Sequence, residues 1–141
     1  PVLIACGHGC TLRLPRISGL RKAKEKPILV MADGRRMLRI FDNLMGNVCK
    51  YAQPGTRVYL TLEKREGYAV ISFKNISREA LNISPDELME RFVRGDASRN
   101  TEGNGLGLSI AKSLTELQQG TMEISVDADL FKVTLRFPVV E

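Results

Sequence analysis

The stretch Gly103 to Leu108 (GNGLGL) combines glycine spacing and position in a way that favours anion binding. It forms a GxGxG pattern at the start of an amphipathic segment that predicts a helix over residues 108–117. Glycines let backbone N–H groups approach an anion closely, and a helix N-terminus adds unpaired donors and a positive dipole end. A glycine-rich turn alone is weak evidence, and a purely structural role is the default for it.

A second set of polar side chains occurs at helical spacing in residues 36–51 (RMLRIFDNLMGNVCKY). Asn43, Asn47 and Lys50 share one helix face, because positions i, i+4 and i+7 lie one turn above another. Tyr51 lies at the edge of that line. Asparagine is a weak helix former, so two on one face indicate that their amides have a task. The alternative is a solvated polar face, which every helix of a soluble protein must have.

The other side of this helix is apolar. The apolar stripe recurs at three- and four-residue steps and consists of Phe41, Leu44, Met45, Val48, Cys49 and Ala52. Asp33 is the expected N-cap, and Pro54-Gly55 should end the helix near Ala52.

Strand patterns surround the two helices. The expected elements, in chain order, are a buried strand at 28–32, the long helix, a β-hairpin of strands 56–64 and 68–74, a short helix at 85–92, a mobile loop at 94–105, the helix 108–117, and a second hairpin of strands 121–126 and 130–139. Helices interspersed with hairpins predict the α/β class, as a two-layer sandwich in which a mixed β-sheet carries helices on one face.

Length and composition fit one soluble domain. The 141 residues can bury roughly two-thirds of the surface of the unfolded chain. No apolar run approaches transmembrane length, and the apolar start PVLIAC is too short for a signal peptide. The formal charge of +5 suggests an anionic partner. A nucleotide fits this as well as nucleic acid, for which interleaved basic and aromatic residues are missing.

Cysteines and glycines exclude several other classes. The odd set Cys6, Cys10 and Cys49 is typical of a reducing compartment, and the cluster CGHGC around His8 lacks a fourth metal ligand. The glycine loop has no strand directly before it, as a dinucleotide-binding fold requires, and no Gly-Lys-Ser/Thr, as a P-loop requires. Protein Ser/Thr/Tyr kinase signatures do not follow it.

Three segments in order, NLMGNVCKYA (43–52), ERFVRGD (90–96) and TEGNGLGLSIA (101–111), together resemble the N, F and G2 boxes of a known family. This is the ATP-binding catalytic domain of sensor histidine kinases, in the superfamily of gyrase, Hsp90 and MutL. The resemblance covers about residues 28–139 and implies the Bergerat-type ATP-binding fold. It divides the chain into an atypical segment 1–26 and a catalytic domain 27–141.

The resemblance implies ATP and Mg²⁺ as ligands and a role for each matching residue. Asn47 would coordinate Mg²⁺ between the phosphates, with Asn43 supporting it from one turn earlier. Lys50 would contact phosphate, and Tyr51 would line the adenine pocket. Mg²⁺ takes oxygen ligands and keeps several waters, so one amide oxygen plus phosphates is a plausible set.

The remaining implied site residues lie around the glycine loop. Phosphate would be held at the helix start by Gly103, Gly105, Leu106, Gly107 and Leu108. Phe92 and Arg94 would border the lid, with Arg94 near the transferred phosphate. Phosphoryl transfer needs neutralised charge and aligned reactants, which a Lys, an Arg, a metal and backbone donors supply.

Three positions depart from or refine the family pattern. Asn75 stands where the family's G1 box has the Asp that binds the adenine amino group, and Ser77 replaces a glycine. Asn keeps a carbonyl acceptor but no charge, so the pocket either binds ATP with altered affinity or has lost it; the intact N and G2 boxes favour the first. At Asn43 the ATP-hydrolysing relatives carry a Glu that activates water. Asn cannot act as that base, which indicates a transferase.

The leading hypothesis is therefore a catalytic fragment of a two-component sensor histidine kinase. Its phosphoacceptor would lie on a dimerisation domain, because His8 does not match the acceptor motif. Implied partners are that domain and a response regulator. The resemblance also implies a homodimeric, membrane-anchored kinase with this catalytic domain in the cytoplasm. The alternatives are a degenerate regulatory module of the same fold and, less favoured, an anti-sigma-type serine kinase.

Overall fold

A computed structural model of the chain describes residues 27–81, 84–94 and 107–140, with the side chains of 91–94 excepted. Its longest helix, α1 (Gly34–Tyr51), carries the polar line predicted from the sequence. The Asp33 carboxylate caps α1 by accepting from the backbone N–H groups of Arg35 and Arg36 at 2.9 and 3.1 Å. The helix ends where Ala52 turns to an extended conformation. Both predicted ends of the helix are therefore confirmed.

The buried face of α1 is narrower than the apolar pattern suggests. The buried residues are Met37, Ile40, Phe41, Leu44 and Val48. Cys49 is an exposed free thiol, so its predicted place on the apolar stripe is wrong. Each residue turns the helix by about 100°, and that step after Val48 carries Cys49 out to solvent.

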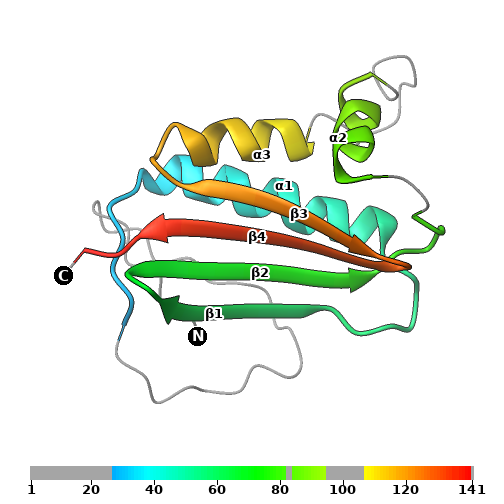
Figure 1. Cartoon of the computed structure of the whole chain (residues 1–141), viewed down its shortest axis with the longest axis horizontal. Helices are drawn as coiled ribbons and strands as arrows, with labels where there is room; N and C mark the ends of the chain where they lie inside the picture. Colours follow the sequence, from blue (N-terminus) through cyan, green and yellow to red (C-terminus); the bar gives the residue numbers. More distant parts are fainter. Residues whose placement is uncertain (1–26, 82–83, 95–106, 141) are drawn as a thin grey trace.

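Four strands form one sheet beneath the helices (Figure 1). The strands are β1 (Tyr59–Arg65), β2 (Tyr68–Ile76), β3 (Thr121–Asp127) and β4 (Leu130–Pro138), in the spatial order β1-β2-β4-β3. α2 (Pro85–Arg94) and α3 (Gly107–Glu116) connect β2 to β3 and lie on the same face as α1. The predicted α/β sandwich, with its helices on one face, is confirmed.

One detail of the sheet differs from expectation. Every strand pair that the structure describes is antiparallel, so the sheet is not mixed over these residues. The reason lies in the crossover through α2 and α3. β2 and β3 run in the same direction, but β4 lies between them and is antiparallel to both.

Both predicted hairpins are present, with ends shifted by a few residues. The first turns through Glu66 and Gly67, whose φ angles of 51° and 81° give the backbone twist that two-residue hairpin turns require. The second turns through Ala128, also at positive φ.

The expected strand at 28–32 is reduced to bridge pairing at Leu29 and Val30. Val30 pairs with Val139, and Leu29 O accepts from Val140 N–H at 2.8 Å. Val30 is 7% exposed, whereas Leu29 and Met31 are 45% and 73% exposed. Val30 is buried in the core and Ile28 and Ala32 pack against it as partly buried side chains, so alternate residues of the run share one core-facing side. The predicted buried strand is therefore present only as bridge pairing, with one of its two faces against the core.

The two later helices were predicted within two residues of their observed ends. α2 begins with a reciprocal cap, in which Glu87 N–H donates to Ser84 Oγ at 3.2 Å and Ser84 N–H donates to Glu87 Oε2 at 3.3 Å. Arg94 closes α2 and does not open a loop. The rest of the predicted mobile loop, and the CGHGC cluster, lie outside the described residues.

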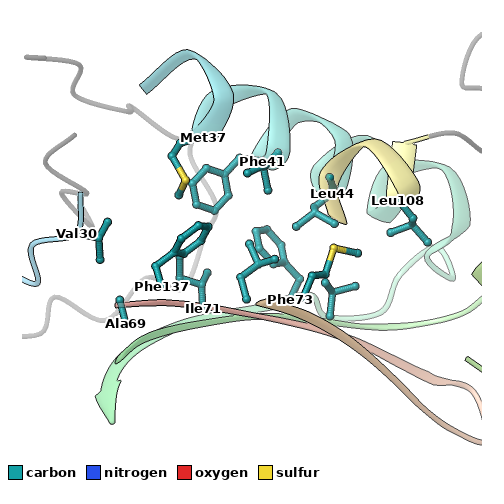
Figure 2. Packing of buried hydrophobic residues seen from close by; sticks show 14 of the residues in the cluster. Val30, Met37, Phe41, Leu44, Ala69, Ile71, Phe73, Leu108 and Phe137 are labelled. Carbon is teal, nitrogen blue, oxygen red and sulfur yellow. The ribbon is translucent and has the colours of Figure 1, made fainter. Parts of the chain in front are cut away.

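The core fills the space between α1, α3 and the sheet (Figure 2). Phe41 of α1 packs on Phe73 of β2 with 5.8 Å between the ring centroids. Leu108 of α3 and Phe137 of β4 are each 1% exposed. Because burying each such side chain contributes about 1.5–3 kcal/mol, this layer fixes α1 and α3 on the sheet. No helix in the described part of the chain is both long and apolar enough to span a membrane.

Candidate functional site

The middle of α1 lies against the first residue of α3. A Cβ added to Gly107 would lie 3.8 Å from Asn43 Cβ and 3.9 Å from Asn43 Oδ1. The helix pair thus brings the Asn line and the end of the glycine loop into contact. The first turn of α3 also carries the backbone N–H groups that helix geometry leaves without intrahelical acceptors.

Among the described residues, two buried side-chain polar atoms have no hydrogen-bond partner. They are Asn43 Nδ2 and Asn75 Oδ1. Leaving a buried polar group unpaired costs about 1–3 kcal/mol, so native structures contain few of them. Both atoms belong to residues that the sequence predicted for the site. A ligand with an acceptor beside Asn43 and a donor beside Asn75 would satisfy them.

Asn75 lies in β2 directly opposite Phe131 of β4, and only 2% of it is exposed. Alternate residues of a strand point to the same face. Its side chain therefore shares the helix-facing side of the sheet with Ile71 and Phe73, which Figure 2 shows pointing toward α1. The Asn75 amide is a polar group in an otherwise apolar row.

The C-terminal end of α1 is tied to the end of β2 by backbone contacts. Gln53 N–H donates to Ile76 O at 2.8 Å, Arg78 N–H donates to Tyr51 O at 2.8 Å, and Ala52 pairs with Ser77 in an isolated bridge. Asn75 is one residue from this tie, and Tyr51 is part of it. The backbone therefore fixes the position of Asn75 relative to Tyr51.

Asn47, Lys50 and Tyr51 continue the polar line of α1 toward that tie, and all three are partly buried. Lys50 Nζ lies 5.1 Å from the centroid of the Tyr51 ring, a cation–π contact. Lys50 is also the basic residue of the last turn of α1, where the helix dipole favours a cation. The polar line of α1 thus extends from Asn43, which lies beside the start of α3, to Tyr51, which lies beside the end of β2.

The other predicted site residues are described less fully. Leu108 belongs to α3, where its side chain is buried in the core and its backbone lies in the first turn. Phe92 and Arg94 lie in the last turn of α2, of which only the backbone is described. Gly103, Gly105 and Leu106 lie outside the described residues.

Sequence reasoning missed the tie between α1, β2 and the second hairpin. Ser77 N–H donates to Asp129 O at 2.7 Å, so the turn between β3 and β4 also holds the segment after Asn75. No residue pattern signals such a tie, because it is made by backbone groups that nearly every residue possesses.

No group of three or more His, Cys, Asp or Glu side chains gathers within the described ranges. The cation ligand that the sequence suggests is instead the Asn47 amide oxygen, a hard ligand of the kind that Mg²⁺ accepts.

Comparison with known proteins gives a consistent family. Residues 32–141 match the model of the family described as histidine kinase-, DNA gyrase B- and HSP90-like ATPase. The chain is 28% identical over 124 residues to the probable sensor kinase SilS of Salmonella typhimurium, covering 86% of this chain and 25% of SilS. It is 32% identical over 104 residues to the sensor histidine kinase YvrG of Bacillus subtilis, covering 73% of this chain and 18% of YvrG.

Solved structures agree with the fold. The crystal structure of full-length ShkA in complex with AMPPNP matches with a TM-score of 0.60 and 25% identity, over 79% of this chain and 23% of ShkA. The chain thus spans about a quarter or less of the length of these relatives.

Proposed function

The chain belongs to the family of histidine kinase-, DNA gyrase B- and HSP90-like ATPases, and we propose that it is the ATP-binding catalytic domain of a two-component sensor histidine kinase. The domain comprises residues 27–141. The observation that carries this proposal is the pair of unpartnered buried amide atoms, Asn43 Nδ2 and Asn75 Oδ1, at two predicted nucleotide contacts. Further support comes from relatives named as sensor kinases and from ShkA, which was solved with an ATP analogue.

The base of ATP binds at the end of β2. Asn75 Oδ1 accepts a hydrogen bond from the adenine amino group, which removes the cost of its burial without a partner. Tyr51 lines the same pocket, because the backbone tie holds it beside the end of β2. An aromatic ring there offers the base a flat apolar surface.

The phosphates bind along α1 and at the start of α3. Lys50 supplies a positive charge, and the first turn of α3, with Gly107 and the glycines before it, supplies backbone N–H groups. Asn43 contributes its buried Nδ2 as a donor to this end of the site. Asn47 holds Mg²⁺ through its amide oxygen, and the metal neutralises phosphate charge when bound.

The chemical step is transfer to a histidine. The histidine nitrogen attacks the γ-phosphorus, the bond from that phosphorus to the bridging oxygen breaks, and ADP leaves with the bond electrons. The chain's own residues position and neutralise the phosphates, with Arg94 near the transferred group and Phe92 at the border of the lid. Asn43 has no titratable lone pair near neutral pH, so it does not activate water, and the site favours transfer over hydrolysis.

The acceptor histidine belongs to a dimerisation domain outside this sequence, and a response regulator receives the phosphoryl group next. The whole kinase is a membrane-anchored homodimer with this domain in the cytoplasm. Relatives named as a sensor kinase and a sensor histidine kinase support the sensory kinase part of this assignment.

Thermal unfolding with ATP, with and without Mg²⁺, tests the proposal. A ligand that binds only the folded state stabilises it by about 2.7 kcal/mol at one hundred times its dissociation constant. We expect Tm to rise with Mg-ATP and the Mg²⁺-dependent part of the rise to disappear in Asn47→Ala. Asp42→Ala is the matched control, because Asp42 is an exposed residue on another side of the same helix.

The same titration tests the alternative of a degenerate module. If millimolar ATP leaves Tm unchanged in the native chain, nucleotide binding is lost and the kinase assignment fails. If Tm rises, the next measurement is phosphohistidine formation on an added sensor-kinase dimerisation domain.

A further inference from the structure

Asn75 is the polar residue of β2 whose burial lacks a structural explanation. It is 2% exposed, and its Oδ1 has no partner. Asparagine is disfavoured in strands, and its neighbours on the helix-facing side, Ile71 and Phe73, are apolar. A purely structural Asn would hold a nearby backbone group by a hydrogen bond, yet the backbone tie beside it is made without its side chain.

The chemistry of a carboxamide differs from that of a carboxylate at this position. An ionised Asp only accepts hydrogen bonds, whereas Asn carries one acceptor and two donor hydrogens on groups of nearly equal shape. Rotation of the Asn75 amide by half a turn exchanges its oxygen and nitrogen within almost the same volume. One side chain can therefore face either a donor or an acceptor on a ligand.

The 6-position of a purine carries either a hydrogen-bond donor or a hydrogen-bond acceptor. Adenine carries an amino donor there, and hypoxanthine and guanine carry a carbonyl acceptor. A carboxylate facing the carbonyl would set two acceptors against each other in a buried site, which is strongly disfavoured. The Asn75 amide meets an amino group with Oδ1 and a carbonyl with Nδ2.

We propose that Asn75 makes the base site of this chain permissive at the purine 6-position, so that it binds 6-oxopurine nucleoside triphosphates as well as ATP. This inference rests on the proposed nucleotide-binding function. It assigns position 75 as the residue that sets purine specificity.

Isothermal titration with ATP, ITP and GTP in the presence of Mg²⁺ tests it. ITP is the sharpest probe, because its base differs from adenine at the 6-position and at N1 and carries no 2-amino group. We expect the dissociation constants of ATP and ITP to lie within about tenfold of each other in the native chain. In Asn75→Asp the preference for ATP should grow by about tenfold or more, through tighter ATP and weaker ITP binding.

Two further variants keep the test decisive if Asn75→Asp does not fold. Asn75→Ala should weaken ATP and ITP alike, because the native amide contacts both bases. Lys74→Gln changes the neighbouring residue, which points to the opposite face of the sheet, and should leave the ratio of the two constants unchanged.

The outcomes separate this inference from the proposed function. If ATP binds the native chain and ITP binds more than about a hundredfold more weakly, the site is selective, and this inference is overturned while nucleotide binding stands. The inference is also overturned if Asn75→Ala loses affinity for ATP but keeps its affinity for ITP. It is overturned as well if Asn75→Asp prefers ATP over ITP no more than the native chain does. If none of the three nucleotides binds, both proposals fail.

Discussion

Asn43 and Gly107 meet across the contact between α1 and α3, with 3.8 Å between Asn43 Cβ and the place of a Cβ on Gly107. This spacing is ordinary van der Waals contact, so the position accommodates a methyl group and little more. The contact joins the two polar segments of the proposed site. The size of the side chain at position 107 should therefore affect ligand binding at the site more than it affects folding.

We expect Gly107→Ala to fold with a free energy of unfolding within about 1 kcal/mol of the native value, because helices favour Ala over Gly by a similar amount. Gly107→Ile should raise the dissociation constant of ATP by about tenfold or more, since its branched side chain displaces either Asn43 or the start of α3. Chemical denaturation and ATP titration measure the two effects. Ser113→Ile, at an exposed position of α3, is the control. Native ATP affinity in Gly107→Ile would show that this contact is not part of the site.

Gly120 and Gly46 give a matched pair for stability. A Cβ on Gly120 would lie 2.7 Å from the Phe137 ring and 2.9 Å from Arg136 O, whereas a Cβ on Gly46 meets nothing within 4 Å. Gly120→Ala should destabilise the chain by about 1–3 kcal/mol, the usual cost of overpacking. Gly46→Ala should stabilise it by about 0.5–1 kcal/mol, because it lies within α1. Denaturant unfolding of both variants measures the difference. Equal effects would contradict the close packing at Gly120.

Local signals made α1, the two hairpins and the later helices predictable. Asp33 and Pro54 delimit α1 through side-chain and backbone chemistry that acts within a few residues. The Glu66-Gly67 turn requires positive φ angles, for which glycine is the usual residue. The site residues on α1 followed from helical spacing, because 3.6 residues per turn fix which side chains share a face.

What the sequence could not predict depends on long-range packing. The apolar run at 28–32 places Val30 in the core, but it pairs with the rest of the chain through bridges and forms no regular strand. The position of β4 between β2 and β3 depends on where the crossover returns, and no single segment carries that information. The unpartnered atoms of Asn43 and Asn75 likewise appear only once burial is known.

Asp33 should make stability depend on pH at the acid end. Hydrogen bonds from the backbone N–H groups of Arg36 and Arg35, together with the nearby Arg charges, lower its pKa below the ordinary value of 3.8. A carboxyl with a lowered folded pKa contributes stability above its unfolded pKa and loses it as the pH falls through the folded value. We expect Asp33→Ser, which keeps a capping oxygen without a titrating group, to flatten the fall in Tm below pH 3.8. If Tm of Asp33→Ser falls at acid pH as steeply as Tm of the native chain, carboxyls other than Asp33 cause the pH dependence.

Lys50 should contribute to ATP affinity through its charge. It lies in the last turn of α1, and its Nζ is 5.1 Å from the centroid of the Tyr51 ring. A charged hydrogen bond to phosphate is typically worth about 1.5–3 kcal/mol, so Lys50→Gln should weaken ATP binding by roughly ten- to a hundredfold. The salt dependence of ATP binding should also shrink, because one charge contact is lost. Titration of ATP at two salt concentrations measures both effects.

Two comparisons separate a local contact of Lys50 from the overall charge of +5. Lys112→Gln removes the same charge from an exposed position of α3 and should change ATP affinity little. Adenosine, which has no phosphate, should bind Lys50→Gln and the native chain alike. If Lys112→Gln loses as much affinity as Lys50→Gln, the attraction comes from the field of the whole domain. If adenosine binding also falls, Lys50 instead supports the base pocket through its contact with the Tyr51 ring.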